Sequence, residues 1–564
     1  MIFYRTRWLS LGFGLFFLAA LGRLFYLQVV SHQTYLALER KQIRKPIELT
    51  AKRGNITDRN GILLATTTEA KTVYVNHQEV RDFERTAEQL AAVLNMPPKI
   101  VYQKIDEPRY FGLLQRRISD AEAQKLQELK IPGVHLIDDQ KRLYLRGNLA
   151  ANTIGFVNVE NQGAAGLELT LEKYLQGIAG RLIIESDPFG QEIHAGERIL
   201  QEPRDGDNVQ LTIDEFLQYT ARKHLAAALQ KNQADRGCVL ILDTASGEIL
   251  ALVSLPDFDP NRYGHYPPEN MRNNAVQLNY EPGSVFKVIT VAAALELGLV
   301  STNTTFINGN TYEHAGHIIR ESHPLKDPER PRTVKDIISE SLNISSAQLA
   351  LRIGKTRFAN YLQKFRFGRR LNIFLPGEEI GLLKPLEQIG RHEEAVYGFG
   401  QAFAVTPLQM LAAFNVIAND GIYVKPRLVQ RITDHQGKII QDFRPQPEKQ
   451  KVLSSHAARE IRLMLQECVQ KGTGTLAAIP GYSIGGKTGT SQKARPGGGG
   501  YLPQDYISSF AGIVPGNRPR LTILVLIDNP RGDLRRTGGG DVAAPVFQEI
   551  AKEAVRYLAI PEDI

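Results

Sequence analysis

The stretch Glu281-Pro282-Gly283-Ser284-Val285-Phe286-Lys287 is the most informative for the fold, because a proline and a glycine here directly precede a predicted buried helix. Pro282 and Gly283 interrupt the chain, and the apolar run that continues to Leu297 predicts the helix. A serine at its start lies at the positive end of the helix dipole, which favours a developing alkoxide. Lys287 lies one turn further on the same face, where a neutral lysine can accept the serine proton. Ser-x-x-Lys alone is a weak signal, and an N-cap serine beside a solvated lysine is the simpler interpretation.

Two further motifs lie towards the C-terminus. Ser341-Leu342-Asn343 follows a segment that is predicted to be helical from Thr333, and Ser-x-Asn alone usually marks a helix cap. Lys487-Thr488-Gly489-Thr490 ends the strand-like run from Tyr482 to Gly486. A glycine at a strand edge allows a substrate backbone to pair closely with it, and a lysine beside two hydroxyls can hold a carboxylate. The three motifs together are a far stronger signal than any one of them.

In their order and spacing, these motifs resemble those of penicillin-binding proteins and serine β-lactamases. Arg53-Gly54-x-Ile56-x-Asp58-Arg59-x-Gly61 is similar to the membrane-proximal motif of class B penicillin-binding proteins, as is the run from Gly163 to Glu168. The segments Ser508 to Gly512 and Gly539 to Phe547 resemble the septal, cell-division type. The resemblance covers nearly the whole chain, but Phe367 to Asn372 departs from the family pattern by lacking its Thr-Gly pair.

The resemblance implies a peptidoglycan D,D-transpeptidase that acts on stem peptides ending in D-Ala-D-Ala and that β-lactams inhibit. Ser284 would attack the peptide carbonyl, Lys287 would accept its proton, Ser341 would relay a proton to the leaving amine, and Asn343 would hydrogen-bond the donor peptide. Lys487 would support the relay and keep Lys287 neutral. Substrate binding is assigned to Thr488, Gly489 and Thr490, and the oxyanion hole to the backbone N–H groups of Ser284 and Thr490. No metal and no cofactor is implied.

The first thirty residues predict a membrane anchor. Arg5 and Arg7 precede the almost wholly apolar run from Trp8 to Val30, which has the length of a spanning helix. Arg23 lies near the far end, where its side chain can snorkel. The preceding positive charge predicts a cytoplasmic N-terminus, with the catalytic part outside the bacterial inner membrane. A cleaved signal peptide is the alternative, but the run is long and no small-x-small site follows it.

Length and charge limit the remaining possibilities. A chain of 564 residues predicts several domains, and its net charge of +8 is scattered without a nucleic-acid module. The predicted order is a tail (1–7), an anchor (8–30), a pedestal of the class B dimerisation type (31–204), a transpeptidase domain (205–558) and a final tail (559–564). The fold class is α/β (α+β): an N-terminal transmembrane helix, an elongated mixed α+β pedestal and a penicillin-binding domain with an antiparallel sheet flanked by helices.

Several local patterns predict individual elements. Asn60-Gly61 favours a hairpin turn, Glu84 to Leu94 a helix, and Thr406-Pro407 a helix start. Two strands are expected from Gly237 to Leu255, two more at Ile507 to Val514 and Leu521 to Ile527, and a closing helix from Ala543 to Tyr557. Cys238 and Cys468 lie too far apart for a disulfide framework, and we expect free, inert thiols.

The family implies further partners and leaves alternatives. Expected partners are the membrane, a multi-spanning peptidoglycan polymerase and other divisome proteins, with no nucleic acid. An elongation-type class B transpeptidase would use the same chemistry in a different complex. A β-lactamase would not need the module before Asp205, and a β-lactam sensor normally has several membrane spans. An inactive divisome scaffold would not need an intact motif set.

Overall fold

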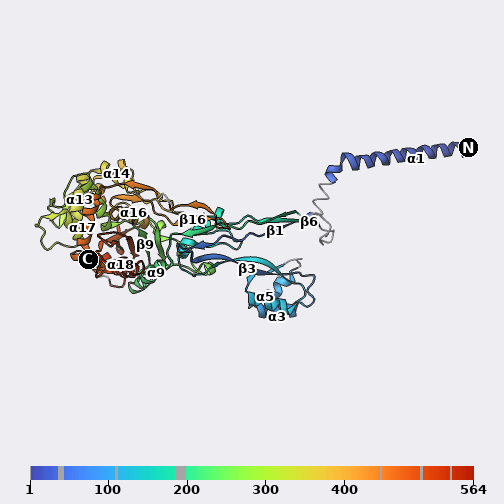
Figure 1. The fold of residues 1–564 in the computed structure, drawn as a ribbon, viewed down its shortest axis with the longest axis horizontal. Helices are drawn as coiled ribbons and strands as arrows, with labels where there is room; N and C mark the ends of the chain where they lie inside the picture. Colours follow the sequence, from blue (N-terminus) through green and yellow to red (C-terminus); the bar gives the residue numbers. More distant parts are fainter. Residues whose placement is uncertain are drawn as a thin grey trace. The chain divides into compact units, whose positions relative to one another are not determined.

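The computed structural model describes residues 2–35, 44–107, 112–185, 199–444, 447–495, 499–533 and 537–564 (Figure 1). Contacts divide the chain into two compact units, Met1–Lys52 with Gln176–Gly206, and Arg53–Leu175 with Asp207–Ile564. The domain bounds inferred from the sequence remain predictions. Met1 of the predicted tail, residues 36–43, 108–111 and 186–198 of the predicted pedestal, and residues 445–446, 496–498 and 534–536 of the predicted transpeptidase domain lie outside the described residues.

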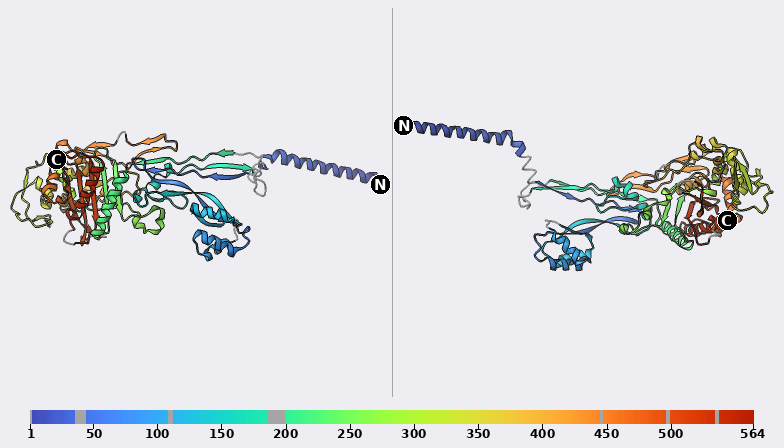
Figure 2. Two further views of the ribbon diagram at one scale, coloured as in Figure 1. Left: turned by 60° about the horizontal axis from the view of Figure 1, so that its bottom comes forward. Right: turned by 180° about the vertical axis from the view of Figure 1, so that it is seen from behind.

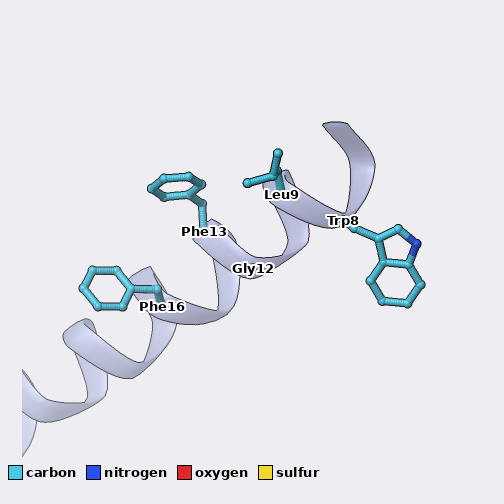
Figure 3. A pocket seen from close by; sticks show the side chains of 5 residues that line it. All are labelled: Trp8, Leu9, Gly12, Phe13 and Phe16. Atoms are coloured by element: carbon cyan, nitrogen blue, oxygen red, sulfur yellow. The ribbon is translucent and has the colours of Figure 1, made fainter. Parts of the chain in front are cut away.

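The first unit contains the predicted anchor. Helix α1 spans Ile2–Phe25 and a π-helical turn, Tyr26–Val30, follows it. The window Arg7–Val30 is long and apolar enough to cross a membrane, and none of it is buried within the molecule. Figure 3 shows Leu9, Phe13 and Phe16 projecting from one side of this helix and Trp8 pointing away from them. A helix that is apolar on every side needs an apolar surrounding, which a bilayer supplies.

The first unit also contains a three-stranded antiparallel sheet. Its order is β1 (Arg44–Leu49), β6 (Gly180–Glu185) and β7 (Ile199–Gln201). Because β1 pairs with β6 over more than a hundred intervening residues, the chain leaves this sheet, forms part of the second unit and then returns.

In the second unit, the Asn60-Gly61 turn joins two strands of a mixed sheet. Gly61 has φ +86°, and Asp58 Oδ1 accepts the N–H groups of Asn60 and Ile62 at 2.8 Å each, so the predicted hairpin turn is present. The sheet has the order β17 (Ile439–Asp442), β16 (Val429–Thr433), β8 (Asn208–Leu211), β2 (Ile56–Thr57), β3 (Leu63–Val75) and β4 (Gly112–Ile118), with β5 (Val134–Tyr144) paired to β3. Helices α3 (Phe83–Leu94), α4 (Pro98–Asp106) and α5 (Asp120–Leu129) contribute a core of their own.

A buried ion cluster joins the two segments that resemble the membrane-proximal family motif. Glu168, which is fully buried, accepts from Arg53 Nε at 2.6 Å and from Arg142 Nε at 2.7 Å. Arg53 also contacts Glu172 at 2.6 Å, and the Tyr144 hydroxyl donates to Glu168 Oε1 at 3.3 Å. Removing one partner from such a cluster leaves a buried charge uncompensated, which is strongly destabilising. The motif residues at Arg53 and Glu168 therefore have a structural role.

The part of the second unit that contains the three predicted motifs is built on a five-stranded sheet in which every pair is antiparallel, as expected (Figure 2). Its order is β10 (Ile249–Leu255), β9 (Arg236–Asp243), β21 (Leu521–Asp528), β20 (Tyr501–Val514) and β19 (Gly485–Ala494). Along β9, Leu240 packs in one hydrophobic core and Val239 in the other. Both faces are thus covered, which explains why the sequence of β9 is apolar throughout.

Helices cover the two faces of this sheet. Helices α9 (Glu215–Lys231) and α18 (Gly539–Tyr557) contribute to one core, and α11 (Lys287–Glu296) and α16 (Pro407–Ala418) to the other. Cys468, in α17 (Ser455–Lys471), is a buried free thiol, as is Cys238, whose pKa burial raises far above its usual value. The unit also contains smaller helices and strands: α6 Ala151–Ile154, α7 Gly166–Thr170, α8 Glu172–Leu175, α10 Asn274–Gln277, β11 Thr305–Phe306, β12 Thr311–His314, β13 His317–Arg320, β14 Arg332–Thr333, α12 Val334–Ser339, α13 Asn343–Ile353, α14 Lys355–Lys364, α15 Arg391–Tyr397, β15 Ile422–Val424 and β18 Lys449–Lys451.

Local predictions succeed where the signal is local. Thr406 and Gln409 form a reciprocal capping box at the start of α16, with N–H···O distances of 3.2 and 2.9 Å. The closing helix, in contrast, begins at Gly539 and not at Ala543. Its glycines are poor helix formers, but Gly539 and Gly540 leave no room for a side chain: an added Cβ would lie 2.3 Å from Ser509 O and 2.5 Å from Thr473 O, respectively.

Candidate active site

The predicted nucleophile lies on a tight turn. A 3₁₀ turn, η4 (Gly283–Phe286), contains Ser284, and α11 begins only at Lys287, three residues later than the sequence suggests. Gly283 has φ +54°, and its N–H donates to Gly400 O at 3.0 Å. A Cβ on Gly400 would lie 2.3 Å from Gly283 O, so only glycine fits there. The contact with Gly400 fixes this turn, which places Ser284 immediately before the buried helix α11.

Lys287 is one of the two fully buried lysines of the site. Its side chain is fully buried in α11, and its Nζ donates to Asn343 Oδ1 at 2.8 Å, to Ser341 Oγ at 3.4 Å and to Ser341 O. The Ser284 hydroxyl is half-buried and forms no hydrogen bond with any residue that the structure describes. The Lys287 amine is therefore held by the Ser-x-Asn motif, while the Ser284 hydroxyl is left available.

The Ser341-Leu342-Asn343 segment links two helices. Helix α12 ends at Ser339 and α13 starts at Asn343, and Ser341 between them adopts φ +63°, which is unusual for a residue with a side chain. Glu321 accepts the backbone N–H groups of Asn343 and Ile344 at 2.8 Å each, so a carboxylate caps α13. Strained backbone that the surrounding structure holds in place is typical of functional sites.

The third motif lies on the edge strand β19. Lys487 is fully buried, and its Nζ donates to Ser341 Oγ at 2.9 Å, so this hydroxyl is within reach of both lysines. Thr488 Oγ1 lies 3.3 Å from Lys487 Nζ and 2.8 Å from Thr473 Oγ1. We had expected the motif to end a strand-like run from Tyr482 to Gly486. It lies instead within the first half of β19, because pairing with β20 extends through this polar stretch to Ala494.

Gly489 and Thr490 bring β19 against the nucleophile turn. A Cβ on Gly489 would lie 2.8 Å from Val285 Cγ2 and 2.3 Å from Ser509 Oγ, so a side chain there would separate the strand from the turn. A Cβ on Gly283 would lie 3.3 Å from Thr490 O, which shows how closely the two backbones approach. Thr490 Oγ1 accepts the N–H of Gly539 at 3.1 Å and so contacts the start of α18.

Burial lowers the pKa of both lysines. Burial lowers the pKa of Lys287 well below its usual value, the charge of Lys487 lowers it further, and Glu321 opposes both effects. Burial also lowers the pKa of Lys487, to about 8. A lysine whose pKa is lowered in this way is neutral in an appreciable fraction of molecules and can accept a proton. Two effects lower the pKa of Lys287, burial and the charge of Lys487, so Lys287 is the more readily neutral of the two lysines.

The structure thus brings together the side chains of Lys287, Ser341, Asn343, Lys487 and Thr488, and it packs the backbones of Ser284, Gly489 and Thr490 closely. Sequence reasoning missed Glu321 and Thr473, because neither belongs to a short motif. It also missed the partners of Glu281, which accepts from Ala402 N at 3.0 Å and from the Tyr501 hydroxyl at 3.1 Å. Burial raises the pKa of Glu281 to about 6, although both hydrogen bonds oppose this effect.

Comparisons with known proteins agree over nearly the whole chain. Residues 237–552 match the model of the penicillin-binding protein transpeptidase domain, and residues 48–211 match that of the penicillin-binding protein dimerisation domain. Stage V sporulation protein D of Bacillus subtilis is 33% identical over 95% of this chain and 83% of that protein. Peptidoglycan D,D-transpeptidase FtsI of Escherichia coli K12 is 30% identical over 96% of this chain and 90% of that protein. The crystal structure of penicillin-binding protein 3 from Mycobacterium tuberculosis in complex with aztreonam has a TM-score of 0.72 and 27% identity, covering 92% of this chain and 98% of that one.

Proposed function

The chain belongs to the penicillin-binding protein transpeptidase family, and from this premise we propose that Ser284 is the acylated nucleophile of a septal enzyme. The chain is a class B penicillin-binding protein with peptidoglycan D,D-transpeptidase activity, and it binds peptidoglycan and β-lactams. The assignment of individual residues, the cellular process and the partners are the proposed part.

In the proposed acylation, Ser284 Oγ attacks the carbonyl between the two terminal D-alanines. The Ser284 proton passes to the neutral amine of Lys287, and Ser341 delivers a proton to the departing D-alanine nitrogen. The C–N bond breaks as the Ser284 ester forms. The proton that Lys287 accepted replaces the one that Ser341 gave up. The amine of a neighbouring stem peptide then attacks the ester and returns a proton through Ser341 and Lys287 to Ser284 Oγ, so the C–O bond breaks as the new peptide cross-link forms. Backbone N–H groups of Ser284 and Thr490 stabilise the oxyanion in both halves.

One observation carries this assignment: Ser341 Oγ lies 3.4 Å from Lys287 Nζ and 2.9 Å from Lys487 Nζ. A hydroxyl between two buried amines can receive a proton from one side while it gives a proton on the other. The second cation also lowers the pKa of Lys287, which keeps that amine neutral. The arrangement therefore supplies both a base for Ser284 and a path for its proton to the leaving group.

The lifetime of the acyl-enzyme tests the proposed activity. The full-length chain in detergent, exposed to benzylpenicillin, is expected to gain the mass of one intact drug molecule and to retain it for many minutes. A transpeptidase has no water positioned for rapid hydrolysis of the ester, whereas a β-lactamase releases the hydrolysed drug. Intact-mass spectrometry over time measures this lifetime. Rapid loss of the adduct with accumulation of penicilloate would identify a β-lactamase instead.

We further propose that the enzyme acts in cell division. Its tail segments resemble the septal type, and its similarity to peptidoglycan D,D-transpeptidase FtsI supports the proposal. The apolar helix Arg7–Val30 would anchor the chain with a cytoplasmic N-terminus and an extracytoplasmic catalytic part. A multi-spanning peptidoglycan polymerase and other divisome proteins would be its partners.

Depletion in the bacterium that encodes the protein separates septal from elongation function. Cells that lose a septal transpeptidase are expected to grow without dividing and to form filaments, because only the division wall is affected. Light microscopy during depletion gives the cell length and width. Spherical cells would show that the enzyme serves elongation, and the septal assignment would then fail while the transpeptidase activity stood.

A further inference from the structure

A basic cavity of about 430 Å³ lies in the second unit, apart from the three motifs. Arg357, Lys364, Arg366 and Arg369 line it, and no acidic side chain that the structure describes does so. Leu297, which also lines it, directly follows α11, whose first residue is Lys287. Ten helical residues rise about 15 Å, so the cavity is at the far end of α11 from the catalytic lysine.

The positive charge around this cavity is largely uncompensated. Arg366 pairs with Glu448 at 2.6 Å. Within the part of the chain that the structure describes, Arg357 donates only to carbonyl oxygens, at 2.6 Å to Ile353 O and 3.1 Å to Arg352 O. Lys364 and Arg369 are exposed and form no ion pair with any described residue. Three of the four cations therefore lack an acidic partner among the residues that the structure describes.

The sequence concentrates this charge in one segment. Residues 355–370 contain six cations and no acidic residue: Lys355, Arg357, Lys364, Arg366, Arg369 and Arg370. Arg369 belongs to the segment Phe367 to Asn372 that departs from the family pattern, so the family pattern does not account for it. A solvated charged surface is the simpler explanation of such a run. Like charges repel, however, and their convergence on one recess focuses an electrostatic field there.

The neutral lining adds hydrogen-bonding groups. The side-chain amides of Asn360, Gln363 and Gln450 line the cavity, and none of them has a hydrogen-bond partner among the described residues. Each amide both donates and accepts, which suits hydroxyl groups. Tyr361 and Leu297 form an apolar wall beside them. A water molecule takes about 30 Å³, so the cavity has room for considerably more than a lone phosphate ion.

We propose that this cavity binds a phosphorylated, hydroxyl-rich ligand of the sugar-phosphate class. A phosphomonoester carries a charge of about −1.5 to −2 at pH 7, which matches several unpaired cations better than a single carboxylate does. Guanidinium groups bind phosphate oxygens in a bidentate manner, and the amides contact the hydroxyls of the ligand. This binding is independent of the proposed chemistry at Ser284, and its test uses a separate measurement.

Calorimetric titration of the full-length chain in detergent with glucose 1-phosphate tests the proposal, with glucose as the uncharged reference. We expect the variant Lys364→Glu/Arg369→Glu to bind glucose 1-phosphate at least about tenfold more weakly than the parent, a loss of about 1.4 kcal/mol. The control Arg459→Glu/Arg556→Glu changes the net charge equally at two exposed arginines outside the cavity, and its affinity should change less than about twofold.

Three results would overturn the proposal. They are no binding of glucose 1-phosphate at millimolar concentrations, equal weakening in both charge-reversal variants, and equal affinity for glucose and glucose 1-phosphate. Both variants should still be acylated by benzylpenicillin at the parental rate, which verifies that they are folded. Because acylation and glucose 1-phosphate binding are measured separately, failure of one leaves the other standing.

Discussion

Replacement of Ser284 by alanine is expected to abolish the benzylpenicillin adduct and to reduce transpeptidation on the order of a millionfold, as removal of a catalytic serine does elsewhere. The structure gives the reason. Ser284 is on a turn held by Gly283 and Gly400, and its hydroxyl is free of hydrogen bonds to described residues. Intact-mass spectrometry of the full-length variant measures the effect, and a thermal melt verifies folding.

The variant Ser301→Ala provides the matched control. Ser301 is an exposed serine on the loop beyond the same helix, and its replacement should leave acylation unchanged. A stoichiometric adduct on the Ser284→Ala chain would show that another residue is acylated. The proposed active site would then be wrong, whatever the effect on peptidoglycan synthesis.

Replacement of Lys287 by alanine is expected to slow acylation about 10²- to 10⁴-fold, the usual contribution of a general base. Stopped-flow measurement of acylation by a chromogenic β-lactam gives the rate. Lys287→Arg should not restore it, because a guanidinium stays protonated and cannot accept the Ser284 proton. The control Lys471→Ala removes an exposed lysine whose ion pair among the described residues is with Glu467, and it should retain the parental rate.

The pH dependence of acylation of the parent shows whether Lys287 acts as a proton acceptor or only as a positive charge. Only neutral Lys287 accepts a proton, so the rate should rise as pH increases through its lowered pKa. Lys487 has a pKa of about 8 and loses its charge above that pH, so binding of the β-lactam carboxylate should weaken there. The expected profile is bell-shaped. Parental activity in Lys287→Arg, or a rate that keeps rising above pH 8, would contradict these roles.

Several features could be predicted from the sequence because the residues that indicate them lie within a few positions of one another. Ser284 and Lys287 are separated by one helical turn, and the Thr406–Gln409 capping box spans four residues. The apolar runs of β9 and β10 and the anchor Trp8 to Val30 likewise depend on neighbouring residues. Local backbone preference and hydrophobic periodicity act over such distances, so these element types could be predicted without a fold. The candidate site residues were identified in a different way, from the resemblance of three motifs together to a known family.

The relations between these pieces could not be predicted in the same way. Lys487 reaches Ser341 across 146 positions, and Arg53 reaches Glu168 across 115. Distant residues also determine three local features. They are the cap of Glu321 on α13, the pairing that extends β19 to Ala494 and the early start of α18 at Gly539. Sequence by itself determined the candidate residues for acyl transfer and an N-terminal apolar run long enough to cross a membrane. Only the tertiary structure decided that Ser341 lies between two buried lysines, because burial and packing, which lower the pKa of Lys287, arise from contacts that no short segment contains.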